Sequence, residues 1–286
     1  MAGPAGCSSK ALVSSGPLRL ALDAIGELAD DEIDLADAAL QLARVGEPDA
    51  NWRVARDRLT LLARECASMR DAARTLDARA QALSELMARH GFTGDGDTYD
   101  DLDNANLIRV IARRRGLPVA LGILWLHAAR AAGWAIRGVN FPGHFLVALE
   151  TTEGLLALDV FAGGRALGVV QLRAMLRRVH GDKAEPGPGL LDAMTNRDIL
   201  LRLQANIRSR LLVLGQLGAA CECTRDMLRI APGAAQLWQE AALLHQRLDQ
   251  TPEALDCYAR FLRLVPGGPA AARARRRMAE LRGRLN

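Results

Sequence analysis

The spacing of apolar residues changes twice along this chain, and each change limits what the following segment can fold into. From residue 18 to about residue 90, apolar residues recur every three or four positions, which predicts three or four amphipathic helices. After Gly133 the spacing falls to two residues, which predicts three short strands at 136–139, 144–149 and 155–160. From residue 190 onward the spacing is helical again.

These changes predict an α+β protein with three regions. Residues 1–17, rich in glycine and serine, are expected to form a flexible N-terminus. Residues 18–187 are expected to hold a helical platform and a core with a small antiparallel sheet, and residues 188–286 a region of helical repeats. At 286 residues the chain is long enough to bury a substantial core.

A helix is predicted immediately before the strands, over residues 119–132. Pro118 suits its first turn, where the missing N–H would be unpaired in any case, and Gly133 suits its C-terminal end. The acidic, glycine-rich stretch at 91–101 has some likeness to a calcium-binding loop, but it lacks the glutamate that closes such a loop. We predict an ordinary surface loop there, and we predict no metal site.

A histidine and an aspartate lie in the two strands that the turn at 151–154 joins. If either Glu150 or Thr152 pairs with Leu155 across that turn, the alternation of side chains places His144 and Asp159 on the same face of the sheet. An aspartate between two apolar neighbours is costly to bury alone, so it needs a partner, and His144 is the natural one. A histidine oriented by a carboxylate is a common base in nucleophilic enzymes.

The C-terminal region repeats with a period of 34 residues, which is the period of the tetratricopeptide helix pair. The positions that recur are Ala220, Cys223, Met227, Leu228, Ile230 and Pro232, which match Ala254, Cys257, Phe261, Leu262, Leu264 and Pro266. We interpret the region as one degenerate repeat, one good repeat and an arginine-rich capping helix. Stacked helix pairs leave a concave surface whose usual ligand is a peptide.

Composition and charge bear on whether the protein binds nucleic acid, is secreted or enters a membrane. The net charge is +4, but Lys10 and Lys183 are the only lysines, a bias that we attribute to genome base composition. The arginine cluster at 273–284 contains no aromatic residue, so we favour a solvated helix face there over contact with nucleic acid. No secretory signal or membrane-spanning stretch is found, so we expect a cytoplasmic protein, and we predict no cofactor. Free buried thiols are expected for the five cysteines, Cys7, Cys66, Cys221, Cys223 and Cys257.

Four segments resemble the bacterial SirB-type transglutaminase-like proteins, which join a transglutaminase-like (papain-like) core to tetratricopeptide-type helices. The segments are YDDLDNANL at 99–107, RRRGLP at 113–118, GVNFPGHFLV at 138–147 and LDVFAGG at 158–164. They occur in the family's order, and the resemblance spans residues 18 to 280.

The resemblance implies where a catalytic site would lie. Active transglutaminases place a cysteine at the start of the core helix, followed by a histidine and an aspartate on adjacent strands. In this chain His144 and Asp159 match the last two, but Pro118 stands at the position of the cysteine. Since an alkyl ring cannot serve as a nucleophile, the resemblance implies a vestigial pair. Asn104 and Asn140 match further family positions and are expected to hydrogen-bond loop backbone.

Two functions stay open at this point. The first is a pseudoenzyme, a regulatory or scaffold protein without catalysis that binds a protein or peptide partner through its repeats. The second is a weak hydrolase or amidase in which His144 and Asp159 activate water, a mechanism that supplies only roughly 10²- to 10⁴-fold acceleration.

Overall fold

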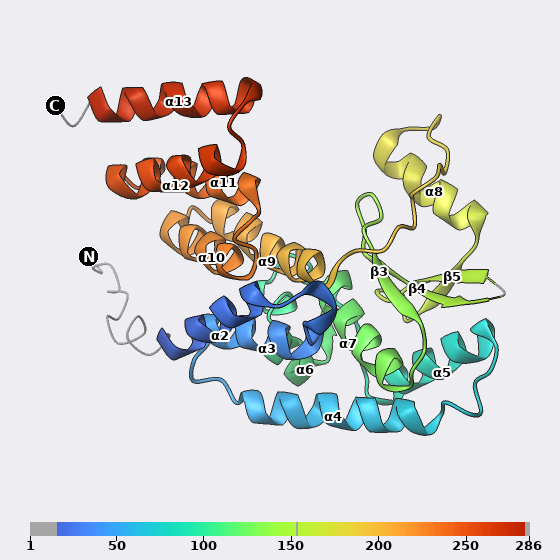
Figure 1. Ribbon diagram of the computed structural model, residues 1–286. Helices are drawn as coiled ribbons and strands as arrows, with labels where there is room; N and C mark the ends of the chain where they lie inside the picture. Colours follow the sequence, from blue (N-terminus) through green and yellow to red (C-terminus); the bar gives the residue numbers. More distant parts are fainter. Residues whose placement is uncertain (1–15, 153, 284–286) are drawn as a thin grey trace. The chain divides into compact units, whose positions relative to one another are not determined.

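The computed structural model describes residues 16–152 and 154–283 (Figure 1). Its contacts divide the chain into two compact units, one of residues 30–203 and one that combines the residues up to 29 with those from 204 onward. Most of the predicted flexible N-terminus, residues 1–15, lies outside the described residues. The last two residues of that region, Gly16 and Pro17, begin helix α2 (Gly16–Glu27).

The helices of the first unit begin where the sequence supplies a side-chain acceptor for free backbone N–H groups. Asp34 accepts from the N–H of Ala36 and Asp37, and Thr75 and Asn106 cap later helices in the same way. The helical elements of this unit are η1 (Asp30–Glu32), α3 (Leu35–Gly46), α4 (Trp52–Ser68), α5 (Leu76–Arg89), η2 (Leu102–Asn104), α6 (Leu107–Arg113), α7 (Pro118–Ala131), α8 (Val169–His180) and the first part of α9 (Asn196–Val213).

Helix α7 is the central helix of this unit. Its N-terminal turn contains Pro118, and Gly133 follows its C-terminal end with a φ of +70°, both as predicted. The helix is apolar on nearly all sides and contacts α3, α4, α5 and α6 as well as four strands. A helix with this pattern is stable only when it is surrounded, so α7 fixes the positions of the elements around it.

An antiparallel sheet follows α7, with strand order β3-β4-β5-β6. Its strands are β3 (Ile136–Val139), β4 (Leu146–Thr151), β5 (Gly154–Asp159) and β6 (Arg165–Leu167). Glu150 pairs with Leu155, which is one of the two registers that the sequence left open for the hairpin. Strand β6 was not predicted, because three residues are too few for an alternation to be visible, and helix α8 was not predicted either. Another small pair, parallel, joins β1 (Thr93–Gly94) to β2 (Arg115–Gly116).

Both faces of the larger sheet are covered. Helices α5 and α7 contact strands from one side. A second apolar cluster joins Leu146, Ala148 and Ala157 of the sheet to Leu172 and Leu176 of α8. A sheet that is buried on both faces reads as short continuous apolar runs, and this explains the sequence of β4.

The other unit contains the predicted repeats as two helix pairs and a final helix. Its elements are α2, the rest of α9, α10 (Leu217–Ile230), α11 (Ala235–Arg247), α12 (Thr251–Leu264) and α13 (Gly268–Gly283). Neighbouring helices from α10 to α13 contact one another in chain order. The apolar stripe expected on the capping helix is present, and its buried residues are Ala271, Ala274, Met278 and Leu281.

Helix α2 packs against α10 of the repeats. Arg19 donates hydrogen bonds to Glu222 and Asp226, and Arg229 pairs with Asp23. The two backbones approach so closely that a Cβ at Gly26 would lie 2.1 Å from the carbonyl oxygen of Arg229. The sequence prediction grouped this helix with the core platform, because periodicity reports that a helix is amphipathic but not which partner covers it.

None of the helices in the described ranges is long and apolar enough to span a bilayer.

Candidate functional site

His144 and Asp159 are hydrogen-bonded to each other. Nε2 of His144 lies 2.9 Å from Oδ1 of Asp159, so the predicted shared orientation of the two side chains is confirmed. His144 lies in the turn before β4, whereas the sequence pattern placed it within the strand. Its own N–H donates to the carbonyl oxygen of Phe141 at 2.9 Å, after the positive φ of Gly143. The turn places the imidazole at the end of the hairpin, where its side chain is 19% exposed.

Asp159 is a nearly buried carboxylate, and three donors point at one of its oxygens. Besides His144, the backbone N–H groups of Phe161 and Ala162 donate to Oδ1 at 3.1 and 3.2 Å. Burial acts to raise the pKa of Asp159, but the hydrogen bond and charge of His144 and these backbone donors outweigh it, so the pKa lies below its usual value.

The ionised carboxylate determines the tautomer of His144. A carboxylate can only accept hydrogen bonds, so Nε2 of His144 must carry the proton that it shares with Asp159. In the neutral ring Nδ1 is then an acceptor. Within the described part of the chain, Nδ1 has no hydrogen-bond partner. The imidazole is therefore oriented as a base would be.

Arg202 of α9 holds the backbone next to this imidazole. It donates to the carbonyl oxygen of His144 at 2.7 Å, and its guanidinium lies 5.9 Å from the ring centroid of Phe145. Burial lowers the pKa of Arg202, and the nearby Tyr99 opposes that shift. Sequence reasoning missed this residue, because it lies 58 positions after His144 in an ordinary helical pattern.

Two aromatic rings form the next layer of the site. The ring of Phe161 meets the imidazole edge to face at 6.4 Å, and Tyr99 meets Phe161 in the same way at 5.8 Å. Gly94 of β1 lies against Phe161, because a Cβ there would come within 2.5 Å of Cδ2 of its ring. The short parallel pair β1–β2 therefore supports the aromatic side of the site.

The loop that carries Tyr99 lies mostly at the surface, as predicted, but it is anchored by one buried aspartate. Asp95 is only 1% exposed and accepts from the N–H and hydroxyl of Thr98 at 2.9 and 2.7 Å. These bonds, with help from Asn104 and Arg113, hold the pKa of Asp95 below its usual value. Asn104 donates to the carbonyl oxygen of Thr98 at 2.7 Å, as expected for a residue that supports the loop backbone. The signal for this anchor was the spacing of an aspartate and a threonine three residues apart.

Pro118 lies on the face of α7 that the His144 turn covers. Pro118 and Gly122 are four residues apart and so share one side of the helix. At Gly122 this side is in contact with Phe145, the residue after His144, because a Cβ there would lie 2.2 Å from Cε1 of its ring. Both Pro118 and Phe145 are buried. The start of α7 and the turn of His144 are therefore joined by packing.

The described cysteines are all buried free thiols. Burial raises the pKa of Cys66 and Cys223 to about 12, and that of Cys221 and Cys257 to about 11. The repeat helices hold the last three, and Cys66 lies on the buried face of α4 with Leu59 and Leu62. Cys7 lies outside the described residues. At neutral pH a thiol with such a pKa is a thiolate in roughly one molecule in ten thousand or fewer.

No cluster of three or more histidine, cysteine, aspartate or glutamate side chains that could hold a metal ion occurs at 16–152 or 154–283.

Comparison with known families agrees with this arrangement. The transglutaminase-like superfamily matches residues 53–205, which is more than half of the chain, and a tetratricopeptide repeat family matches residues 207–279. This chain belongs to the transglutaminase-like superfamily. Within it the chain is of the SirB type, as the resemblance in the sequence suggested.

Bacterial relatives match this chain along much of their length. A UPF0162 protein of Vibrio cholerae is 30% identical over 243 residues, covering 84% of this chain and 90% of the relative. A UPF0162 protein of Xylella fastidiosa is 33% identical over 184 residues, covering 63% of this chain and 66% of the relative. The protein SirB1 of Salmonella typhimurium is 24% identical over 193 residues, covering 66% and 72%.

Proposed function

We propose that this SirB-type protein acts by binding a partner protein through its repeat helices, and that its transglutaminase-like core does not carry out thiol-dependent acyl transfer. The observation that carries the proposal is the chemistry at the start of α7. Pro118 occupies the position that the family resemblance assigns to the nucleophile. The side chain of proline contains only carbon atoms, so it has no thiol or hydroxyl that could attack a carbonyl group.

The other thiols support this proposal. The four described cysteines are buried, and their raised pKa values leave almost none of the thiolate that acyl transfer needs. We propose that His144 and Asp159 are a retained pair whose present duty is to fix the turn at the end of the hairpin.

A hollow among the repeat helices supports a binding role. A cavity of about 520 Å³ is lined by residues of α2, α10, α11 and α12. Trp238 lies at this cavity and is fixed by the hydrogen bond from its Nε1 to the carbonyl oxygen of Pro232 at 2.9 Å. Arg260 lies 5.6 Å from the Trp238 ring centroid. An arginine beside an aromatic ring is a common anchor for a peptide.

The test is site-dependent capture of a partner. A photo-crosslinking amino acid placed at Glu27, an exposed residue that lines the cavity, in living cells of the source bacterium, should capture a specific protein. Arg260→Glu should abolish that capture. Arg263→Glu, an exposed arginine one turn further along α12, serves as the matched control and should leave it unchanged. Capture that is identical in Arg260→Glu and the wild type would rule out binding at this groove.

A second function, weak hydrolysis, is favoured by one observation. His144 is partly exposed, bonded to an ionised carboxylate, and has Nδ1 directed away from Asp159, which is the arrangement of a general base. Thioester and amide substrates offered to the wild type and to His144→Ala test it. Turnover that His144→Ala retains, or no turnover in either protein, eliminates the hydrolase. Turnover lost in His144→Ala but unaffected by thiol alkylation would establish it.

A further inference from the structure

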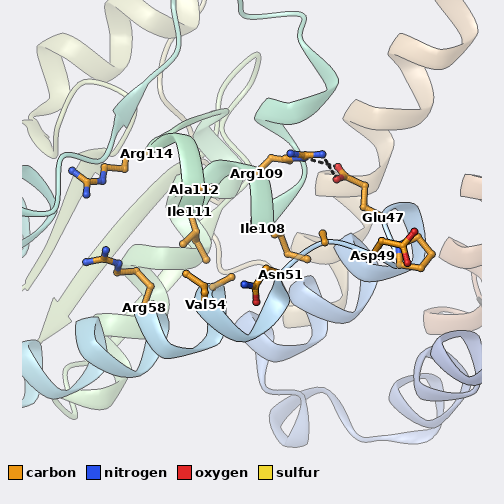
Figure 2. Close-up of a pocket in the computed structure, with 13 residues that line it drawn as sticks. Glu47, Asp49, Asn51, Val54, Arg58, Ile108, Arg109, Ile111, Ala112 and Arg114 are labelled. Carbon is orange, nitrogen blue, oxygen red and sulfur yellow. Dashed lines mark hydrogen bonds and ion pairs between the residues drawn. The ribbon is translucent and has the colours of Figure 1, made fainter.

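A second hollow lies in the transglutaminase-like core, far in sequence from the repeats. It has a volume of about 730 Å³ and is formed by the link between α3 and α4, the first turns of α4, and α6 (Figure 2). His144 and Asp159 are not among its lining residues. Any function of this cavity is therefore separate from the site around His144 and from the cavity among the repeat helices.

The middle of the cavity is apolar. Val54 of α4 is 56% exposed, a high value for a branched aliphatic residue, and it lies beside Ile108 and Ile111 of α6. Figure 2 shows Val54 and Ile111 facing one another between the two helices. Single exposed aliphatic residues are ordinary on protein surfaces. This one lines a concave site that charged groups flank on both sides.

Two arginines lie together at one end of the cavity. Arg58 follows Val54 by one helical turn on α4, and Arg114 follows Ile111 just beyond α6, so both continue from the apolar floor (Figure 2). In the described residues neither guanidinium has a carboxylate partner within ion-pair distance. Arg113 and Arg115, on either side of Arg114, are both paired with aspartates.

Arg114 is also an unusual residue for its backbone position. Its φ is +61°, in the left-handed region, and its N–H closes α6 by donating to the carbonyl oxygen of Val110. Glycine or asparagine is the usual residue at such a helix end. The stem of the arginine lies over Gly91, where a Cβ would come within 3.2 Å of its Cδ. The helix cap is made by the backbone of Arg114 and does not require an arginine side chain. That side chain lines the cavity instead.

The opposite end of the cavity carries the reverse charge. Arg109 is neutralised there by Glu47, with Nε to Oε1 at 3.0 Å. Asp49 is exposed beside that pair, and no cation pairs with it in the part of the chain that is described (Figure 2). The cavity is thus ordered from two unpaired cations, across an apolar floor, to an unpaired carboxylate.

We infer that this cavity binds a linear peptide of a partner protein through a carboxylate held by Arg58 and Arg114 and an aliphatic side chain seated on Val54 and Ile111. A lysine, an arginine or a free amino group further along the peptide would meet Asp49. A guanidinium favours a carboxylate because it offers two parallel N–H donors, and this end of the cavity has two guanidiniums. The carboxylate can come from an aspartate or glutamate side chain or from the end of the peptide chain.

The experiment measures binding of fluorescent synthetic peptides to the full-length protein by polarisation at low and high salt. One peptide carries glutamate, a leucine-isoleucine pair and lysine in that order, with both ends blocked. A second replaces the glutamate by glutamine, a third presents the carboxylate as a free C-terminus, and a fourth has the order of charges reversed. Only the first, the third or both should bind, and added salt should weaken that binding.

Variants locate the binding. Arg58→Gln/Arg114→Gln, which removes both charges and keeps a polar side chain at each position, should weaken binding by roughly tenfold or more. Val54→Asp should weaken it similarly. The matched controls are Arg64→Gln and Leu61→Asp, exposed residues on the same helix α4 that do not line the cavity, and they should bind normally. Equal binding of the glutamate and glutamine peptides, unchanged affinity in Arg58→Gln/Arg114→Gln, or no binding by any peptide would overturn the inference.

Discussion

Each of the two units of this protein has a histidine next to a side chain that matters in thiol enzymes. In one unit that side chain is an aspartate, and in the other it is a cysteine. In the core, His144 is bonded to the ionised Asp159 and is partly exposed, but the neighbouring helix begins with Pro118. In the repeats, His245 lies 3.5 Å from Sγ of Cys221, and both residues are buried. One unit has an oriented base without a thiol, and the other has a thiol beside an imidazole without access.

The comparison shows that proximity of residue types does not define a catalytic pair. Sγ of Cys221 is at similar distances from both nitrogens of His245, 3.5 and 3.7 Å, so it does not lie along a single N–H direction. Burial raises the pKa of Cys221 to about 11. Nδ1 of His245 is occupied by Oε1 of Gln250 at 2.7 Å. These features belong to a packed helix interface, whereas the side chain of His144 is partly exposed and is bonded to a carboxylate.

The largest difference between the two histidines should appear in stability. His245→Ala is expected to destabilise the repeat unit by about 2–4 kcal/mol, because it leaves a cavity in a buried interface and removes the bond to Gln250. Urea unfolding followed by far-UV circular dichroism measures this change. His180→Ala, at the exposed end of α8, is the control and should change stability by less than about 0.5 kcal/mol. A cost as small as that of the control would mean that His245 is not a packing residue.

A change in the packing beside His144 should have the next largest effect. Gly122→Ala is expected to cost about 1–3 kcal/mol, because the new methyl group would overlap the buried ring of Phe145. Gly46→Ala is the matched control, since nothing lies within 4 Å of a Cβ there, and it should be neutral or slightly stabilising. The imidazole signals of His144 in NMR spectra should shift in Gly122→Ala alone. Unchanged stability and unchanged spectra would show that Phe145 does not couple α7 to the His144 turn.

Removal of the Asp159 charge should have a smaller effect that depends on pH. The pKa of Asp159 is lowered in the folded protein, so its ionised form stabilises the fold above the unfolded pKa of about 3.9, and this stabilisation is lost as the pH falls through the folded value. Asp159→Asn should cost about 1–2 kcal/mol near neutral pH and progressively less toward the acid end of that window. Denaturation of both proteins at several pH values measures it. A stability difference that does not change with pH would exclude a lowered pKa as its source.

The last prediction is that the described cysteines do not react with an alkylating reagent in the native protein. Iodoacetamide at neutral pH should label Cys66, Cys221, Cys223 and Cys257 only after denaturation, because their thiols are buried and protonated. Peptide mass spectrometry identifies the labelled positions, and Cys7→Ala protein removes the contribution of Cys7. Rapid native labelling of any of the four would reopen the possibility of a catalytic thiol.

Local pattern was sufficient wherever a contact joins neighbours in sequence. Alternation placed Asp159 on the same face as His144 in either of the two registers open to the β4–β5 hairpin, and the two side chains are bonded in the structure. The helix start at Pro118 followed from the fixed φ of proline and its missing donor. The 34-residue period predicted the helix pairs of the repeats, since each pair exposes one apolar face that its neighbour must cover.

Local pattern was not sufficient where the partner is distant. Asp95 reads as one of several loop aspartates, and only the folded loop shows that it is buried. In the sequence, Arg202 cannot be told apart from other helix residues. Only the structure shows that it donates to the carbonyl oxygen of His144. The sequence also did not show that Arg58 and Arg114 line the same cavity. One lies on α4 and the other just beyond α6, and only the folded unit brings them to that cavity.

The sequence by itself determined the class of fold, the repeats and the shared face of His144 and Asp159, because periodicity and alternation are local properties. Tertiary structure decided which thiols are protonated, which aspartate anchors the site loop and which arginines keep a free charge. Those properties depend on burial and on partners that the chain brings together only when it folds.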